Sequence, residues 1–152
     1  MKKIILLCTA LILFSLYSLG QIAPEDKIVG VYLTATKTSQ VRVFKATDNK
    51  YYGKVAWITL ESRNKIDSLN PDPKLRTQKR LGMLILRGLS YNAKEQKWEN
   101  GTVYDPDNGK TYDCFLWFDP ANPSVLKLKG YVLGMRFIGR ESEWIKEAKL
   151  RD

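Results

Sequence analysis

The sequence predicts an all-β domain of about eight antiparallel strands, arranged as an up-and-down barrel rather than a sandwich. Short runs rich in β-branched and aromatic residues are separated by turn signals along most of the chain. Several of these runs alternate apolar and polar residues, as strands with one buried and one wet face do. The spacing of the runs suits consecutive hairpins, and closing the sheet removes its exposed edges. These three observations together favour the barrel.

The predicted strands follow one another from residue 28 to residue 145, and helical periodicity is weak beyond the first 20 residues. The strands are Ile28–Thr34, Ser39–Lys45, Tyr51–Leu60, Leu81–Leu89, Trp98–Tyr104, Thr111–Phe118, Val125–Val132 and Arg136–Ile145. The sharpest turn signal between them is Asn108-Gly109, since both residues tolerate the positive φ that a type I′ hairpin turn requires. The long segment Glu61–Arg80 is not a tight turn, and connections of that length are typically functional loops or lids.

Strand alternation assigns faces to the aromatic residues. Tyr112 is expected to point inward, on the face that it shares with Cys114, Leu116 and Phe118. Tyr51 and Trp57 are expected to point inward as well, because Lys54 occupies the opposite face of their strand. Tyr104 lies on or near the same inward set. The sequence leaves open whether these rings fill the barrel or line a cavity, since an eight-stranded barrel can do either.

Residues 1–20 have the pattern of a secretory signal peptide. Lys2 and Lys3 precede an apolar run from Ile4 to about Leu16, and the segment Ser18–Gly20 supplies a cleavage site before Gln21. The run is shorter than the roughly 20 apolar residues of a membrane-spanning helix. We therefore expect an exported protein, periplasmic or secreted, with residues 21–152 as one domain and no transmembrane segment after cleavage.

The composition excludes several kinds of catalysis. The chain has no histidine, which removes Ser-His-Asp and Cys-His mechanisms and most zinc sites. Cys8 would leave with the signal peptide, so Cys114 would be the only cysteine of the mature domain. An apolar setting makes such a thiol inert. We expect a protein that is not an enzyme, with no catalytic residue, no metal site and no cofactor.

The acidic residues offer weaker alternatives. Asp105 and Asp107 lie in an Asp-Pro-Asp-Asn-Gly sequence that forms a turn without any metal, although Asp113 adds a third carboxylate nearby. Whether the long loop binds a cation through Asp67 and its neighbours is left open. Two carboxylates can also hydrolyse glycosides, and the available partners are Glu141, Glu143 and Asp113, of which Glu141 and Glu143 share a strand face. Same-face acids on an exterior strand are more often solubility charges.

The chain is basic, with a formal net charge of +9, of which Lys2 and Lys3 contribute two. Lys74, Arg76 and Lys79 are part of the long loop, followed by Arg80. Nucleic acid is the usual partner of such charge, but export argues against it. An anionic envelope surface or glycan is the more suitable partner for the basic loop 61–80.

Several motifs together resemble a known family of exported bacterial proteins. The segments that carry the resemblance are Tyr51-Tyr52-Gly53-Lys54-Val55, Asp67-Ser68-Leu69-Asn70-Pro71-Asp72, Leu81-Gly82-Met83-Leu84-Ile85-Leu86, Gly101-Thr102-Val103-Tyr104-Asp105-Pro106-Asp107-Asn108-Gly109-Lys110-Thr111-Tyr112 and Leu126-Lys127-Leu128-Lys129-Gly130-Tyr131. Their order and spacing resemble the family called domain of unknown function 2147. The resemblance implies a lipocalin-like (calycin) barrel and an exported location, and it supplies no catalytic residues.

Lipocalin-like barrels typically begin with Gly-x-Trp on the first strand and cover that ring with an arginine from the last strand. Here Gly30-Val31-Tyr32 carries a tyrosine instead, and Arg140 is the arginine of the last predicted strand. A cation over an aromatic ring is worth roughly 0.5–2 kcal/mol. We therefore expect Arg140 to close the barrel over Tyr32.

The function favoured by the sequence is non-enzymatic binding of a small apolar or amphipathic ligand. The expected pocket lies at one mouth of the barrel and is lined by Trp57, Tyr104 and Tyr112, with Arg140 near the closed end. The alternative function is an envelope interaction through the basic loop 61–80. The sequence does not indicate which ligand is bound or how many copies assemble.

Overall fold

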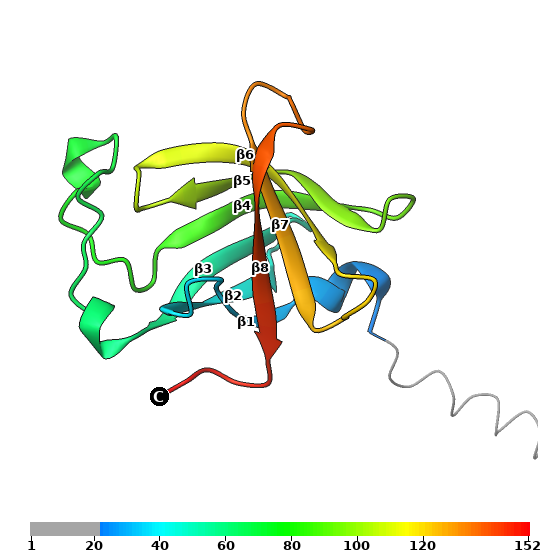
Figure 1. Cartoon of the computed structure of the whole chain (residues 1–152), viewed down its shortest axis with the longest axis horizontal. Helices are drawn as coiled ribbons and strands as arrows, with labels where there is room; N and C mark the ends of the chain where they lie inside the picture. Colours follow the sequence, from blue (N-terminus) through cyan, green and yellow to red (C-terminus); the bar gives the residue numbers. More distant parts are fainter. Residues whose placement is uncertain (1–21) are drawn as a thin grey trace, which may run out of the picture.

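The computed structural model describes residues 22–152, and the predicted signal peptide, residues 1–20, lies outside them. Eight antiparallel strands form a closed barrel in which each strand pairs with its neighbours in the sequence and the last pairs with the first (Figure 1). The strands are β1 (Gly30–Leu33), β2 (Ser39–Lys45), β3 (Tyr51–Ile58), β4 (Leu84–Asn92), β5 (Lys97–Asp105), β6 (Lys110–Phe118), β7 (Val125–Tyr131) and β8 (Gly139–Glu147). The predicted up-and-down barrel of eight strands is therefore confirmed.

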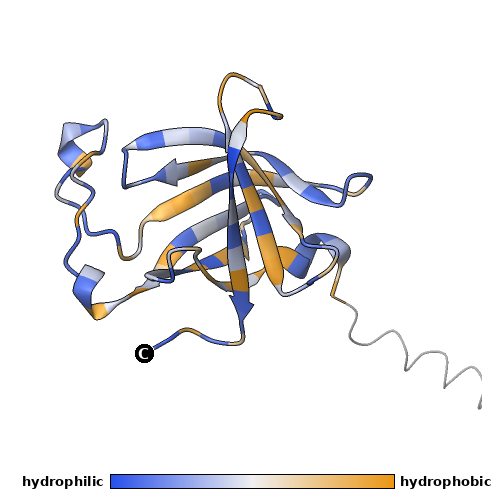
Figure 2. Ribbon diagram, in the orientation of Figure 1, coloured by the Kyte–Doolittle hydropathy of each residue, from blue (hydrophilic) through white to orange (hydrophobic). Residues whose placement is uncertain are grey.

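Alternate residues of the strands fill the barrel, which appears in Figure 2 as orange bands alternating with blue along the ribbon. The period of two places every second side chain inside. On β6, Cys114 and Leu116 are fully buried, and Phe118 packs against them, as the alternation predicted. The buried cluster is Ile28, Tyr32, Val41, Val43, Tyr51, Val55, Ile58, Ile85, Leu86, Leu89, Trp98, Cys114, Leu116, Leu126, Leu128 and Trp144. Side chains, rather than open space, occupy the middle of the barrel.

A 3₁₀ helix, η1 (Pro24–Ile28), covers one end of the barrel just before β1. Proline at its start and acidic residues in its first turn are helix-start signals. Ile28, which the sequence predicted as the first strand residue, is instead the buried last residue of η1. The Tyr32 hydroxyl donates to the Ile28 carbonyl at 2.8 Å, and Trp98 Nε1 donates to the Glu25 carbonyl at 2.8 Å. Both bonds fasten η1 to the core.

An irregularity between β2 and β3 turns Trp57 away from the interior. Gln40 pairs with Trp57 while Val41 pairs with Val55, so Ala56 is an extra residue on β3. A bulge of this kind shifts the alternation by one and reverses the faces beyond it. The prediction that Trp57 points inward is therefore wrong. Its indole instead donates to the Asp152 carbonyl at 2.9 Å, in the tail that follows β8.

The same tail buries a glutamine on the outside of β2. Gln40 is fully buried, donates to the Lys149 carbonyl at 3.2 Å and accepts from the backbone N–H of Arg151 at 2.8 Å. Its amide also donates to Glu147. The Arg151 guanidinium lies 5.6 Å from the centre of the Trp57 ring. The C-terminal residues thus form part of the packed structure.

The connection between β3 and β4 is long but ordered, and it lies against the β5–β6 hairpin at the end of the barrel away from η1 (Figure 1). It contains two single-turn 3₁₀ helices, η2 (Leu60–Ser62) and η3 (Pro73–Leu75). Arg80 donates to the Asp107 carboxylate at 2.5 Å and to the Pro106 carbonyl at 2.9 Å. These contacts attach the basic loop 61–80 to the hairpin.

The β5–β6 hairpin differs in detail from its prediction. Four residues, from Pro106 to Gly109, connect the strands, and the Gly109 N–H donates to the Asp105 carbonyl at 2.8 Å. Gly109 has φ +69°, but Asn108 does not have a positive φ, so the turn is not type I′. A four-residue loop with a left-handed glycine at its end replaces it. The glycine also lets the Leu69 carbonyl approach, since a Cβ there would lie 2.0 Å from that oxygen.

The last strand begins three residues later than predicted, at Gly139 instead of Arg136. Arg140 therefore lies at the start of β8, exposed and opposite Gly130, rather than over Tyr32. Lys146, near the other end of the strand, has its ammonium 5.8 Å from the centre of the Tyr32 ring. The cation over the first-strand ring is thus a lysine, and the prediction for Arg140 is wrong.

Within residues 22–152, no helix is long and apolar enough to cross a membrane.

Candidate functional site

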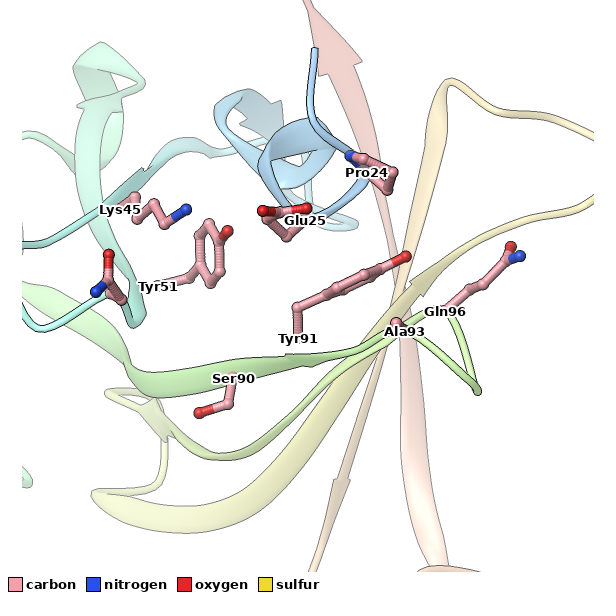
Figure 3. A pocket seen from close by; sticks show the side chains of 9 residues that line it. Pro24, Glu25, Lys45, Tyr51, Ser90, Tyr91, Ala93 and Gln96 are labelled. Carbon is pink, nitrogen blue, oxygen red and sulfur yellow. The ribbon is translucent and has the colours of Figure 1, made fainter. Parts of the chain in front are cut away.

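An open pocket of about 730 Å³ lies at the mouth of the barrel beside η1 (Figure 3). Four parts of the chain meet there: η1, the β2–β3 turn with its flanking strand ends, the end of β4, and the β4–β5 turn. The lining residues are Pro24, Glu25, Lys45, Asn49, Tyr51, Ser90, Tyr91, Ala93 and Gln96. Its volume falls within the roughly 300–1,000 Å³ of small-molecule sites.

One wall of this pocket is a polar cluster that joins η1 to the barrel. The hydroxyl of the buried Tyr51 donates to Asp26 Oδ1 at 2.7 Å. The Lys45 ammonium lies 3.0 Å from the same oxygen and 5.5 Å from the centre of the Tyr51 ring. All three polar groups therefore satisfy one another, and Lys45 is held at the rim.

The protonation states of the cluster follow from these contacts. The hydrogen bond from Tyr51, together with Lys45, holds the pKa of Asp26 below its usual value. The same carboxylate raises the pKa of Lys45. Burial, reinforced by Asp26, raises the pKa of Tyr51 to about 12. At neutral pH the cluster consists of a carboxylate, an ammonium and a neutral phenol, of which Lys45 and Tyr51 line the pocket.

The opposite wall is aromatic. Tyr91 contributes its ring to the pocket, and behind it the Trp98 ring lies 5.0 Å away between centroids at an angle of 44°. Phe118 meets Trp98 edge-on at 5.6 Å. Offset and edge-to-face pairs of this kind stabilise one another beyond simple burial. The stack gives the pocket a rigid apolar side that is continuous with the core.

Lys146 is a second cation at this end of the barrel. Its ammonium donates to the Lys27 carbonyl at 2.9 Å and lies 5.7 Å from the centre of the Phe118 ring. Partial burial lowers its pKa. Because it contacts both η1 and an interior ring, Lys146 helps to close the barrel rather than to line the pocket.

The four residues predicted to bind a ligand lie elsewhere. Tyr104 and Tyr112 are half-buried neighbours on the β5–β6 hairpin, where Tyr104 donates to Asp67 at 2.7 Å and Tyr112 accepts from the Asn108 side chain at 2.9 Å. Trp57 packs against the C-terminal tail, and Arg140 is exposed on β8. The structure thus places Tyr104 and Tyr112 on the same hairpin, where Tyr104 pairs with Thr111 and Tyr112 with Val103, and it places Trp57 and Arg140 elsewhere.

Several of the acidic residues that the sequence singles out have structural partners. Asp105 accepts from the Asp107 N–H at 2.9 Å, as a turn-forming aspartate does, and Asp67 accepts from Asn70 as well as from Tyr104. On the outer surface, Glu141 pairs with Lys129 at 3.3 Å and Glu143 with Lys127 at 3.5 Å. Among residues 22–152, no group of three or more His, Cys, Asp or Glu side chains is placed to hold a metal ion.

Cys114 is fully buried on β6, as predicted. Burial, followed by the effect of Asp113, raises the pKa of its thiol to about 12. A thiol in this state is a poor nucleophile at neutral pH.

Sequence reasoning missed most of the pocket because its residues come from turns and strand ends. Tyr51 was correctly assigned to the interior, but its partner Asp26 was not. The signal that could have revealed η1 is Pro24 followed by Glu25 and Asp26, a typical helix start. That helix would have placed polar groups over one end of the predicted barrel.

The closed eight-stranded meander, with a short helix across one end, defines a lipocalin-like barrel. A solved structure with the same fold is protein HP1028 from the human pathogen Helicobacter pylori, described as belonging to the lipocalin family. The two align with a TM-score of 0.68 and 23% sequence identity, over 85% of this chain and 86% of that one. The chain belongs to the DUF2147 family, described as uncharacterized proteins conserved in bacteria, whose family model matches residues 30–146. A comparison with curated proteins found no match.

Proposed function

We propose that the protein is an exported, non-enzymatic barrel that binds a small amphipathic molecule in the pocket beside η1. The observation that carries this proposal is the pocket itself, in which an aromatic wall faces a polar wall. Small-molecule sites typically combine apolar lining with a few fixed polar groups.

The packing of the interior supports binding at the mouth. Tyr32, Leu89 and Leu116 are fully buried in the middle of the barrel, so a ligand of ordinary size would have to displace core side chains to enter. The pocket beside η1 is already open. A ligand there is bound by the rim and would remain partly exposed to water.

The lining indicates what kind of molecule fits. The Tyr91 ring offers a flat apolar surface, while Ser90, Asn49 and Gln96 offer hydrogen bonds to a polar group. Lys45 is paired with Asp26, and Glu25 adds a second carboxylate, so the pocket does not favour a strongly anionic group. An apolar ring or chain with a neutral or zwitterionic polar end matches this arrangement.

Trp98 supplies the signal for a direct test because it lies behind Tyr91. The experiment titrates fatty acids, isoprenoids and small aromatic probes against tryptophan fluorescence in a Trp57→Phe background, which removes one distant emitter. We expect saturable quenching by at least one class. Tyr91→Ala should weaken binding by roughly 1–3 kcal/mol, the scale of burying an aromatic side chain.

Tyr52→Ala is the matched control, since Tyr52 lies on the outer side of β3 and bonds Asp48 instead of lining the pocket. It should leave the affinity unchanged. The proposal fails if no probe gives saturable quenching, or if Tyr91→Ala and Tyr52→Ala bind the same probe with equal affinity.

The basic loop 61–80 supports a second candidate function, the binding of an anionic envelope surface or glycan. The loop is fixed to the β5–β6 hairpin, and it exposes Arg63, Lys65, Lys74, Arg76 and Lys79. Lys74→Glu with Lys79→Glu should elute from an anionic polysaccharide column at clearly lower salt than the wild type. An equal elution position would exclude this function for the loop.

Export is the remaining part of the proposal, supported by the signal-peptide pattern of residues 1–20. The intact mass of protein recovered from its host should correspond to a chain that begins at Gln21. A mass that retains residues 1–20 would refute it.

A further inference from the structure

The loop between β7 and β8, residues 132–138, exposes an unusual amount of apolar surface. Leu133 is 87% exposed, Phe137 81%, Ile138 56% and Val132 44%. Figure 2 shows the loop largely in orange, with pale and blue stretches between, standing away from the barrel. Isolated exposed apolar residues are ordinary, but a group of four within seven residues marks an interaction site.

The other hairpin connections of the barrel are polar by comparison. The β4–β5 turn is Ala93-Lys94-Glu95-Gln96, and the β5–β6 turn is Pro106-Asp107-Asn108-Gly109. Turns of this composition form without help from a partner. The apolar composition of 132–138 is therefore not required by the hairpin itself.

The loop is held in a defined conformation. The Met135 N–H donates to the Val132 carbonyl at 3.0 Å, and the Ile138 N–H donates to the Met135 carbonyl at 2.9 Å. Leu133 has φ +54°, a left-handed conformation that is unfavourable for a leucine. The backbone thus keeps a large apolar side chain exposed at a position where glycine or asparagine would adopt the left-handed conformation at lower energetic cost.

Arg136 fastens the loop to the outer face of the barrel. Its guanidinium pairs with Glu99 at 2.5 Å and lies 4.8 Å from the centre of the Phe115 ring. Phe115 in turn stacks on Trp117 at 5.3 Å and packs against Tyr131 at 6.0 Å. A band of aromatic rings therefore adjoins the exposed loop, with Phe115 and Trp117 half-buried and Tyr131 buried.

The charged residues of the loop and its base are both basic. Residues 132–140 contain Arg136 and Arg140 and no acidic residue. Arg136 is paired with Glu99, and Glu141, which follows Arg140, is paired with Lys129. Arg140 is exposed at the base of the loop. Apolar tips flanked by arginine and adjoining tryptophan and tyrosine have the composition of a segment that lies in the interface of an anionic bilayer.

We propose that loop 132–138 inserts Leu133 and Phe137 into the headgroup region of an anionic lipid membrane, with Arg140 at the lipid phosphates. The contact is shallow and reversible, since only one short loop enters the lipid. It uses a surface distinct from both the pocket beside η1 and loop 61–80.

The test measures cosedimentation with vesicles of phosphatidylglycerol and phosphatidylethanolamine in equal amounts, and with vesicles of phosphatidylcholine alone. The wild type should bind the anionic vesicles more tightly. Leu133→Asn with Phe137→Asn should weaken that binding roughly tenfold or more. Leu60→Asn is the matched control, because Leu60 is 75% exposed on a different loop, and it should bind as the wild type does.

A second measurement places the loop in the lipid without removing its apolar residues. An environment-sensitive dye on Leu133→Cys should shift its emission to the blue with anionic vesicles, while the same dye on Leu60→Cys should not. Buried Cys114 does not compete for the dye in the native protein.

Three results would overturn the proposal. The first is equal binding of the wild type and the Leu133/Phe137 double variant, or no dye shift at position 133. The second is loss of vesicle binding only in the Lys74→Glu, Lys79→Glu variant, which would assign the membrane contact to loop 61–80. The third is a wild type that dimerises in sedimentation while the double variant is monomeric, which would make a second copy of the chain the occupant of this surface.

Discussion

The two ends of the barrel are closed in different ways. At the η1 end, side chains from three strands donate hydrogen bonds directly to a short helix: Tyr32, Tyr51 and Trp98. At the opposite end, a long connection lies against the β5–β6 hairpin through Arg80 and Tyr104. The first closure is an extension of the buried core, whereas the second is a loop packed on a hairpin.

The difference has a functional consequence. Because η1 is fastened by buried aromatic residues, it can leave an open pocket beside it without losing its position. The long loop is attached by a close backbone approach, by the Tyr104–Asp67 bond and by the ion pair Arg80–Asp107. Solvent and salt weaken this ion pair, because its aspartate is exposed. We therefore expect substitutions at the η1 end to cost more stability than substitutions at the loop end.

The largest effect is expected at Trp98, which joins η1 to the core. Trp98→Ala removes a ring packed against Tyr91 and Phe118 and leaves the Glu25 carbonyl without its donor. The free energy of unfolding should fall by about 3–5 kcal/mol. Denaturant unfolding measures this free energy. Trp117→Ala is the control, and it should lower the free energy of unfolding clearly less, because Trp117 is half-buried on the outer face. Equal losses would contradict the special position of Trp98.

An intermediate effect is expected where the loop meets the hairpin. Gly109 and Gly88 both have φ +69°, but a Cβ at Gly109 would lie 2.0 Å from the Leu69 carbonyl, whereas a Cβ at Gly88 would meet nothing within 4 Å. Gly88→Ala should therefore cost only the strain of the backbone, about 1 kcal/mol. Gly109→Ala should cost about 1–3 kcal/mol more, through the contact with the loop. Equal melting temperatures for the two variants would show that the approach of the loop is unimportant.

The smallest effect is a dependence of stability on acid pH at the η1 end. The pKa of Asp26 is lower in the folded protein than its usual 3.8, first because of Tyr51 and then because of Lys45. Its stabilising contribution is therefore present above pH 3.8 and is lost as the pH falls through the folded value. Between about pH 6 and about pH 3, the free energy of unfolding should therefore fall less for Asp26→Asn than for the wild type. Identical pH profiles of stability for the two proteins would show that Asp26 does not stabilise the attachment of η1 to the barrel.

The strands were predictable because alternation and turn residues are local signals. All eight were found, and the bounds of Ser39–Lys45 agree with β2. Trp57 was assigned to the wrong face because one extra residue, Ala56, shifts the register, and no local signal marks a bulge there. Arg140 was assigned to the wrong end because β8 begins at Gly139, which moves the whole strand past its expected position.

The site was less predictable than the fold. Its residues come from segments that become neighbours only when the barrel closes, as Glu25 and Gln96 do. Tyr51 was placed correctly because its strand alternates, but the position of Asp26 depends on how a short helix folds back across the barrel. Tertiary arrangement of this kind is not encoded in any single stretch of sequence.

The pairing of β1 with β8 joins the first strand of the domain to the last, with Val31 opposite Glu147. During synthesis β1 therefore has only one of its two partners until almost the whole chain has been made. Contacts between segments so distant in sequence form slowly, because a long loop must close before they can stabilise the fold. The sheet has two unpaired edges through that interval, and the barrel closes only when β8 pairs with β1.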